Sequence, residues 1–273
     1  MELLQGINGV YYLLVCLVLG LIVERMFPWR GGVNISLTRW LRNASLTFYN
    51  TLILSFIPMI AGYGSAVFAQ EQSIGLLNIQ AAPIWIQLLF AVVVLDLASY
   101  GQHRALHHWY FLWRSHRTHH TDRYLDATTA LRFHPFEAVF RTATEAPIIF
   151  MLGLPPEGIL LTYAVHVFVN VFTHANISIS PAIDRTLAIV LVTPNVHHLH
   201  HTTKVEHQYA NFGSAFTIWD RALGTYVPPS ELAKDEVFGV DGPENIAEET
   251  FGNLVLDPFR TPEKSAIPKP AKK

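Results

Sequence analysis

Three histidine-rich stretches, 103-HRALHH-108, 116-HRTHH-120 and 197-HHLHH-201, decide what kind of protein this sequence encodes. The chain has 14 histidines, and all but one of them lie between His103 and His201. Residues i, i+3 and i+4 of a helix share one side of it, so each helical His-x-x-His-His cluster should direct three imidazoles to one spot. Imidazole is a ligand of iron, zinc, copper and nickel. The pattern therefore predicts a metal site made of histidines.

The composition excludes several other classes of protein. Hydrophobic residues make up 51% of the chain and charged residues only 15%, which is untypical of a soluble domain. The 19 basic residues are balanced by 21 acidic ones, so we expect no nucleic-acid partner and no disordered chain. Cys16 is the single cysteine, which excludes an internal disulfide, an iron–sulfur cluster and a thiolate zinc site. Any metal must therefore be held by nitrogen or oxygen.

The number of clustered histidines predicts two metal ions, because one ion needs only three or four such ligands. Other histidines fit bystander roles. His166 is a single histidine on an apolar stretch and is expected to be packed or hydrogen-bonded, and His207 is expected on the surface. His108 and His198 are adjacent to candidate ligands but point elsewhere on a helix, so we expect them beside the ligands or at an interface. His108 could replace His107 as a ligand if the local turn is wide.

Long apolar stretches predict membrane spans, because about 20 apolar residues cross the hydrocarbon core as a helix. The best candidates are Leu3–Val23, Asn43–Gln70 and Gln72–Leu95. Two further apolar stretches, together covering residues 146–183, are separated by Gly153, Pro155, Pro156 and Glu157 and predict a helical hairpin with its turn at the prolines. Whether this hairpin crosses the membrane or enters it and returns stays open.

The distribution of basic residues predicts the orientation, because Arg and Lys accumulate in cytoplasmic loops. Basic residues occur between the first two spans, are absent from residues 43–103, and return from Arg104 onward. The N-terminus should therefore be outside and the histidines on the cytoplasmic side, in either a bacterial inner membrane or the endoplasmic reticulum. We expect an all-α, multi-pass integral membrane protein with a cytoplasmic, helical, histidine-rich di-metal cap.

Three regions follow from this organisation. Residues 1–102 should form the N-terminal transmembrane helices, and residues 103–228 the catalytic region, which includes the membrane hairpin at about 146–183. Residues 229–273 are polar and contain prolines and most of the lysines, so they should form a cytoplasmic tail.

The order of the histidine clusters, with Asp96 and Tyr100 ahead of the first, resembles the fatty acid hydroxylase/sterol desaturase superfamily of membrane di-iron oxygenases. Further similar stretches are TTALRFHPFE at 128–137, FTHANI at 172–177 and NFGSAFTIWDRALGTY at 211–226. The resemblance covers roughly residues 92–228, about half of the chain, and several motifs in the right order are more specific than any one of them.

The resemblance implies two iron ions with O2 as co-substrate, and zinc can replace iron in preparations. The ligands that it implies are His103, His107, His116, His119, His120, His174, His197, His200 and His201, with His134 as a tenth candidate. Some relatives have a further histidine four residues before the position of His174, where this chain has Asn170. His134 or a water molecule could take that place.

Metal-bound histidines usually donate their second N–H to a carboxylate or a carbonyl, so Asp96, Asn195 and Asp220 are candidates for accepting hydrogen bonds from the ligands. Helix-capping or surface positions are the alternative for each of them. The sequence has no haem-attachment motif, no iron–sulfur cysteines and no dinucleotide fingerprint. Electrons should therefore come from a separate partner, such as a ferredoxin or a cytochrome b5-like protein with its reductase.

These features predict hydroxylation of a C–H bond in a membrane lipid, which could be sterol-like, fatty acyl, an ether lipid or a carotenoid. Desaturation by the same site is the nearest alternative, because removal of a second hydrogen gives a double bond. A non-catalytic metal-binding or transport protein is a third hypothesis, which the fixed helical spacing of the ligands disfavours. A zinc metalloprotease is disfavoured because the sequence has no His-Glu-x-x-His motif.

Overall fold

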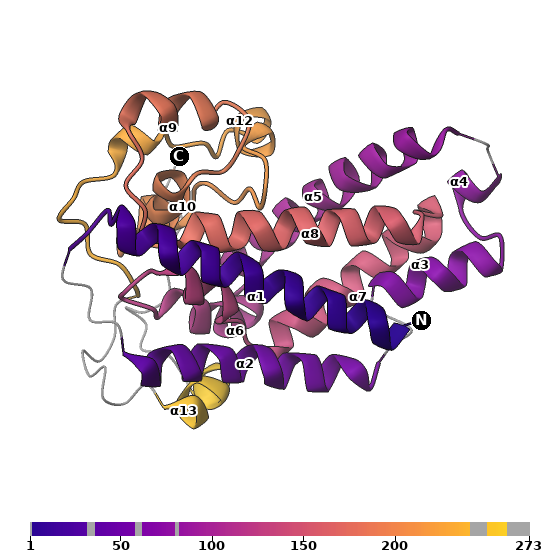
Figure 1. Cartoon of the computed structure of the whole chain (residues 1–273), viewed down its shortest axis with the longest axis horizontal. Helices are drawn as coiled ribbons and strands as arrows, with labels where there is room; N and C mark the ends of the chain where they lie inside the picture. Colours follow the sequence, from indigo (N-terminus) through magenta and orange to yellow (C-terminus); the bar gives the residue numbers. More distant parts are fainter. Residues whose placement is uncertain (1, 32–35, 58–61, 80–81, 241–249, 261–273) are drawn as a thin grey trace.

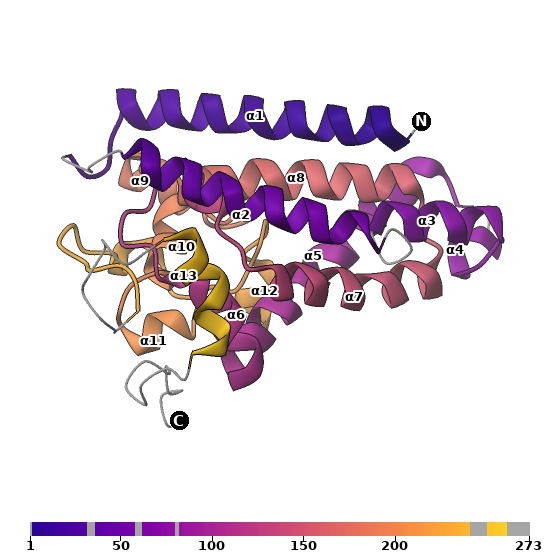
Figure 2. The ribbon, with the colours of Figure 1, turned by 90° about the horizontal axis from the view of Figure 1, so that it is seen from below.

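Five long helices form the body of the protein (Figure 1). The computed structural model describes residues 2–31, 36–57, 62–79, 82–240 and 250–260. Figures 1 and 2 show the long helices side by side along the long axis, with α1, α5 and α8 running in one direction and α2 and α7 in the other. Their bounds are α1 Glu2–Met26, α2 Leu37–Ser55, α5 Ile84–His108, α7 Pro135–Leu152 and α8 Pro156–His174.

Short elements cover the two ends of this bundle. At one end lie α3 (Gly62–Glu71) and α4 (Leu76–Ile79), next to the α7–α8 turn (Figure 1). The opposite end carries α6 (Tyr110–His120), η2 (Ala127–Leu131), α9 (Pro181–Leu187), α10 (Pro194–His200), α11 (Val205–Gln208), α12 (Ile218–Leu223), η3 (Pro229–Glu231), α13 (Phe251–Leu256) and η5 (Asp257–Phe259). Over the described residues, β structure is limited to three isolated bridges, which confirms the all-α prediction.

Two helices are long and apolar enough to cross a membrane in the described part of the chain: Gly9–Met26 within α1, and α5. The first agrees with the span predicted at Leu3–Val23. The second begins at Ile84, directly after Pro83, so the predicted start of the third span at Gln72 is wrong. The predicted single span Asn43–Gln70 is also wrong, because α2 ends at Ser55 and α3 begins only at Gly62.

Proline explains these boundaries, because it lacks a backbone N–H and disfavours helical backbone at the preceding residue. The sequence has Pro58 three residues after the end of α2, and Pro83 immediately before α5. Hydropathy therefore predicts where the apolar segments lie, but the prolines determine where the helices within them begin and end.

Helices α7 and α8 form a hairpin at the predicted turn, joined at Gly153, Leu154 and Pro155, and α8 ends at His174, before the predicted end at residue 183. Gly153 ends α7 in the left-handed conformation at φ 63°, which glycine adopts without the steric cost of a Cβ. The turn lies at the end of the bundle far from the histidines (Figure 1). Helix α7 begins earlier than predicted, at Pro135, so the hairpin reaches the histidine-rich end.

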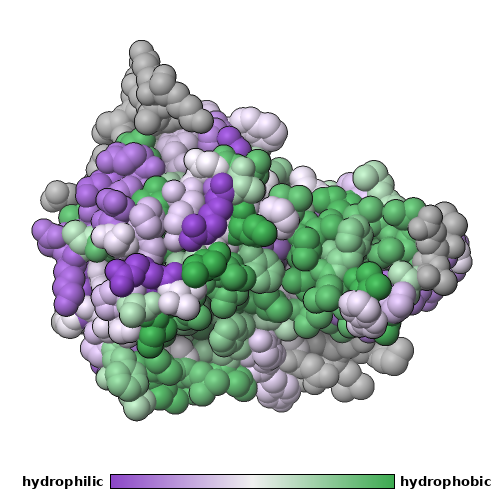
Figure 3. Space-filling model, turned by 90° about the horizontal axis from the view of Figure 1, so that it is seen from above, coloured by the Kyte–Doolittle hydropathy of each residue, from purple (hydrophilic) through white to green (hydrophobic). Residues whose placement is uncertain are grey.

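The surface divides into an apolar and a polar part. Figure 3 shows hydrophobic residues over the end that carries the first half of α5, and hydrophilic residues gathered toward the opposite end. Trp85 and Leu89 on α5, and Val15 and Leu19 on α1, are more than half exposed. Apolar surface of this kind marks contact with a membrane or another protein, and it suits the predicted lipid contact.

A buried ion cluster fixes α2 to the chain that follows α6. The Arg39 guanidinium pairs with Asp122 at 2.6 Å and with Asp126, and all three side chains are almost fully buried. Arg39 also contacts the hydroxyl of Thr129 at 3.0 Å. The cluster joins residues more than 80 positions apart in the sequence. Its first aspartate, Asp122, follows closely after His120, the last histidine of α6.

The predicted tail of residues 229–273 lies partly outside the described residues. The part at 250–260 is packed against the histidine-rich end rather than free of it. Arg117 of α6 forms an ion pair with Asp257, and Thr118 donates to the carbonyl of Leu254 at 3.4 Å. This segment therefore covers one side of α6.

Candidate metal centre

Nine buried histidines form two groups whose side chains converge at one end of the bundle. Within each group, one ring nitrogen of every histidine lies within 4.8 Å of the others. The five-histidine group contains His103, His107, His116, His120 and His200, and the four-histidine group contains His119, His174, His197 and His201. These are the nine histidines that the resemblance implied as ligands.

Each His-x-x-His-His cluster contributes to both groups, so the expected convergence of three imidazoles on one spot is wrong. In α6, His116 and His120 belong to the five-histidine group and His119 to the four-histidine group. In the second cluster the allocation is reversed: His197 and His201 share one group, and His200 joins the other. Neighbouring helix positions differ by about 100° in direction, so i+3 and i+4 can face two adjacent centres.

Hydrogen bonds at Nδ1 define which ring nitrogen is free to bind a metal. Carbonyl and carboxylate oxygens only accept, so a histidine whose Nδ1 faces one must carry its proton there and leave Nε2 with a lone pair. His116 donates to Glu137 Oε2 at 2.9 Å. In four further histidines, Nδ1 donates to a backbone carbonyl oxygen: His103 to Phe212 at 2.9 Å, His200 to Ala210 at 2.7 Å, His174 to Asn170 at 2.7 Å and His119 to Arg132 at 3.3 Å.

The Nε2 atoms then face one another without a proton between them. His103 and His116 approach to 3.1 Å between their Nε2 atoms, as do His119 and His174. Two lone pairs at this distance repel unless a cation lies between them. Ligands at about 2.1 Å from an octahedral ion are about 3 Å apart, which matches these contacts.

Unpartnered nitrogens also fit a metal. Both ring nitrogens of His107 and of His120, and Nε2 of His200, are buried without a hydrogen-bond partner among the described residues. Burial and the nearby His201 lower the pKa of His120, and burial and His116 lower that of His200 to about 3, so both imidazoles are neutral. Neutral imidazole is the form that coordinates a metal. The two groups can therefore hold metal ions.

His134 lies outside both groups, which corrects its assignment as a tenth ligand. Its Nδ1 accepts from the backbone N–H of Phe136 at 3.1 Å and caps α7, and its Nε2 donates to the carbonyl of Val255 at 3.1 Å. Both ring nitrogens are thus used. Asn170 lines the cavity, and its side chain donates to the carbonyl of Ala130 at 3.0 Å.

Asp96, Asn195 and Asp220 were expected to accept hydrogen bonds from the ligands, but their partners among the described residues lie outside the two histidine groups. Asn195 donates to Asp184 at 2.8 Å, which corrects its expected contact with a ligand. Asp220 accepts the backbone N–H groups of Phe212 and Gly213, each at 2.8 Å, and so supports the carbonyl that accepts from His103.

Asp96 accepts from Trp219 Nε1 at 2.8 Å and lies 3.1 Å from His166 Nε2. This contact agrees with the expectation that His166 is hydrogen-bonded rather than a ligand. Asp96 also accepts from the backbone of Ala215 at 2.9 Å, so it connects α5 and α8 to the segment before α12.

The remaining histidines serve as neighbours of the two groups. His207 is buried and lies 3.1 Å from the hydroxyl of Thr202, so its expected surface position is wrong. His108 is exposed and contacts the ring of Tyr209. His198 is buried beside Trp29 and Phe238.

Glu137 is the residue that sequence reasoning missed. It is fully buried in the first turn of α7, with Oε2 on His116 and Oε1 accepting from Arg141 Nε at 2.9 Å. Burial alone would raise the pKa of Glu137, but His116 and Arg141 lower it to about 2, so it is a carboxylate. The signal was present in the stretch TTALRFHPFE, which ends on this residue.

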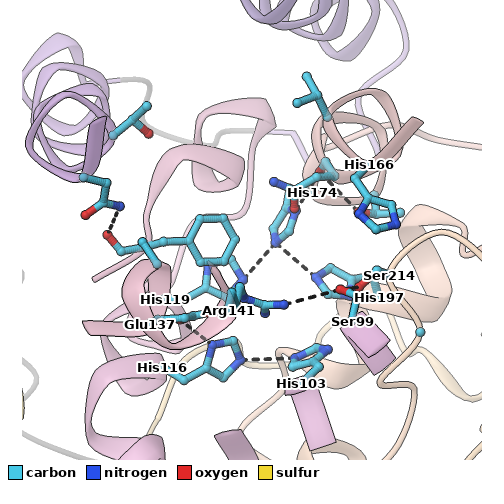
Figure 4. A pocket seen from close by; sticks show the side chains of 18 of the residues that line it. Ser99, His103, His116, His119, Glu137, Arg141, His166, His174, His197 and Ser214 are labelled. Carbon is cyan, nitrogen blue, oxygen red and sulfur yellow. Dashed lines mark hydrogen bonds and ion pairs between the residues drawn. The ribbon is translucent and has the colours of Figure 1, made fainter. Parts of the chain in front are cut away.

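A cavity of about 350 Å³ opens onto both groups (Figure 4). His103 and His116 of one group and His119, His174 and His197 of the other line it. Figure 4 shows Arg141 and Ser99 facing the same space. Helix α2 closes the opposite side with Thr47, Asn50, Thr51 and Leu54, which share one helix face.

The model of the fatty acid hydroxylase family matches residues 88–225, about half of the chain, and this range contains all nine clustered histidines. The chain belongs to the fatty acid hydroxylase family. Glu137 and Arg141 also lie within the matched range, whereas α1 and α2 precede it. In this fatty acid hydroxylase family member, the cavity wall that α2 forms therefore comes from outside the matched residues.

Several curated proteins are similar to this chain. Ornithine lipid hydroxylase OlsE of Rhizobium tropici is 28% identical over 190 residues, which cover 70% of this chain and 56% of that protein. Alkylglycerol monooxygenase of Xenopus tropicalis is 30% identical over 56% of this chain and 32% of its own length. Lathosterol oxidase of Mus musculus is 29% identical over 54% of this chain and 48% of its own length. The matches thus span about a third to just over half of these proteins, and no solved structure matches.

Proposed function

We propose that this protein is a membrane-bound di-iron oxygenase that hydroxylates a C–H bond of a lipid with O2 and externally supplied electrons. The observation that carries the proposal is the pair of buried histidine groups beside one cavity. The names of the similar proteins support it, because they include a lipid hydroxylase, a monooxygenase and a sterol oxidase.

Under this proposal the five-histidine and four-histidine groups each hold one iron. Iron supplies, when bound, the reductive activation of O2 that attack on an unactivated C–H bond requires. The protein keeps its ligands in place through the Nδ1 hydrogen bonds, which leave Nε2 unprotonated in five of the nine imidazoles. Glu137 fixes the ring of His116 and contributes a negative charge beside it.

The cavity suits a lipid that enters from the bilayer. Leu54 and Val167 give it apolar wall, and α8 and α2 connect it with the apolar part of the bundle. The other lining residues include hydroxyl, amide, guanidinium and carboxylate groups as well as the imidazoles. Such a mixture binds an amphipathic molecule better than a hydrocarbon.

Electrons would come from a ferredoxin or a cytochrome b5-like donor with its reductase, on the cytoplasmic side of the membrane. The distribution of basic residues supports this side, because Arg25, Arg39, Arg104 and Arg117 lie at the histidine-rich end of the bundle. A reporter after Lys273 should be cytoplasmic, and one near Ser73 should lie on the other side. A C-terminal reporter on the non-cytoplasmic side would overturn both the proposed orientation and the proposed electron donor.

Lipid mass spectrometry under 18O2 tests the reaction. Cells that express the protein should contain a lipid heavier by one 18O atom than its precursor, and cells with His119→Ala should not. Loss of two hydrogens without added oxygen would establish desaturation instead. Absence of any altered lipid, with metal-loaded protein in the membrane and a functional donor, would overturn the proposal.

A further inference from the structure

Arg141 is a cation with unused hydrogen-bond donors inside the cavity. Its Nε donates to Glu137 at 2.9 Å and its Nη1 reaches Ser99 Oγ at 3.4 Å. Arginine has five N–H donors, and these two contacts are those that the described residues provide. Figure 4 shows the guanidinium between Ser99 and the histidines, where the other donors can meet only a ligand or solvent.

Two acidic side chains lie near Arg141, and each of them has another partner. Glu137 balances Arg141, but this carboxylate is shared with His116. Glu145 also faces Arg141 from the same helix, while it accepts from the hydroxyl of Tyr163 at 3.0 Å and contacts Gln102. The nine imidazoles bring no negative charge, so two divalent cations bound by them would make this wall of the cavity positive.

Arg141 is close to the five-histidine group by two routes. Through Glu137 it is one side chain away from His116. Through Ser99 it is next to α5 at a position four residues, or about 6 Å, before His103. A group bound by Arg141 therefore lies about one helical turn from the histidines.

The size of the cavity limits what it can enclose. A volume of about 350 Å³ is near the lower end of ligand pockets, which range from about 300 to 1,000 Å³. It can therefore contain only one end of a membrane lipid. Guanidinium donors at this depth select the polar end, with Val167 and Leu54 beside the adjoining carbons.

We propose that Arg141 binds the carboxylate or phosphate headgroup of the lipid substrate, so that the oxidised carbon lies among the first few carbons from that headgroup. The position of oxidation rests on the proposed oxygenase function. Headgroup binding does not, because it can be measured without turnover.

Binding to the zinc-loaded, detergent-solubilised protein tests the headgroup. Dissociation constants would be measured by calorimetry for dodecanoate, dodecyl phosphate and methyl dodecanoate. At least one anion should bind tenfold or more tightly than the neutral ester, and the tighter anion identifies the headgroup. Equal affinity for all three would overturn the proposal.

Two substitutions assign this preference to Arg141. Arg141→Gln should weaken anion binding at least tenfold and leave the affinity for the ester unchanged, with metal content measured in parallel. Arg141→Lys keeps the charge beside Glu137 but not the forked donors, so it should retain part of the preference even if the Gln variant loses metal. Arg221→Gln, which removes a cation stacked on Tyr226 outside the cavity, is the control and should bind like the wild type. An unchanged anion preference in both Arg141 variants would overturn the assignment.

The site of oxidation gives a second outcome. Fragmentation of the product should place the oxygen within the first few carbons of the headgroup, and oxygen at the far end of the chain would contradict the predicted position. If no lipid is oxidised while the anion preference persists, the oxygenase proposal fails and headgroup binding by Arg141 stands.

Discussion

Glu137 accepts a hydrogen bond from His116 Nδ1 at 2.9 Å, and both side chains are almost completely buried. A carboxylate in this position fixes the tautomer of the ring and makes its Nε2 a more basic metal ligand. Arg141 holds the other carboxylate oxygen at 2.9 Å, so the orientation of Glu137 is itself determined.

Glu137→Gln should weaken metal binding in the five-histidine group about 10–100-fold, because the amide has nearly the same size but no charge. Metal content after graded chelation would measure the effect. Glu145→Gln is the matched control on the same helix, since Glu145 contacts Tyr163 and no histidine of either group by hydrogen bond. Equal metal retention in both variants would contradict a role for Glu137 in metal binding.

His119→Ala and His200→Ala should each reduce the metal content of one group, because each removes a ligand from a different group. We expect about one tightly bound ion per chain in either variant and less than one in the double variant. Elemental analysis of purified protein would measure this. His108→Ala removes an exposed histidine next to His107 and should keep full metal content.

His134→Ala should destabilise the protein by about 1 kcal/mol without loss of metal, because it removes the cap of α7. Thermal unfolding and metal analysis of the same sample separate the two effects. His134→Asn should restore part of the stability, since Asn is a good N-terminal cap. Metal loss in His134→Ala at unchanged stability would make it a ligand after all.

Arg39→Met should destabilise the fold by about 3–5 kcal/mol, because it leaves the carboxylates of Asp122 and Asp126 buried without their cation. Arg185→Met, a substitution in the exposed part of α9, should have little effect. Thermal unfolding of the two variants at neutral pH measures the difference.

The ion cluster around Arg39 also predicts that the stability of the fold depends on pH. Burial alone would raise the pKa of Asp122, but Arg39 outweighs it and holds the pKa well below its ordinary value. A lowered pKa in the folded state adds stability above the unfolded pKa of about 4, and this stability is lost as the pH falls below it. Wild-type stability should therefore decrease on acidification from pH 5 to pH 3, and the decrease should be smaller in Arg39→Met.

Local spacing and composition predicted the helical class and the α7–α8 hairpin, whereas the nine histidines of the two groups were implied by the family resemblance. The sequence did not predict which histidine belongs to which group, since that depends on how α5, α6, α8 and α10 meet. His134 illustrates the limit: its partner Val255 is 121 residues away, and no spacing rule connects them.

Helix boundaries were the least predictable part of the fold. Residues 43–70 contain no charged side chain, yet the chain divides there into α2 and α3. Glu137 was missed for a different reason, because an acidic residue at the start of a helix is also a common capping feature. Only its contact with His116 identifies its role.

The central claim is that this chain holds two metal ions, one in each histidine group. Elemental analysis of folded protein, prepared anaerobically with iron, tests it most directly. We predict two iron ions per chain, with zinc replacing iron where the iron supply is not controlled. A reproducible content of one ion or none in folded protein would contradict the account.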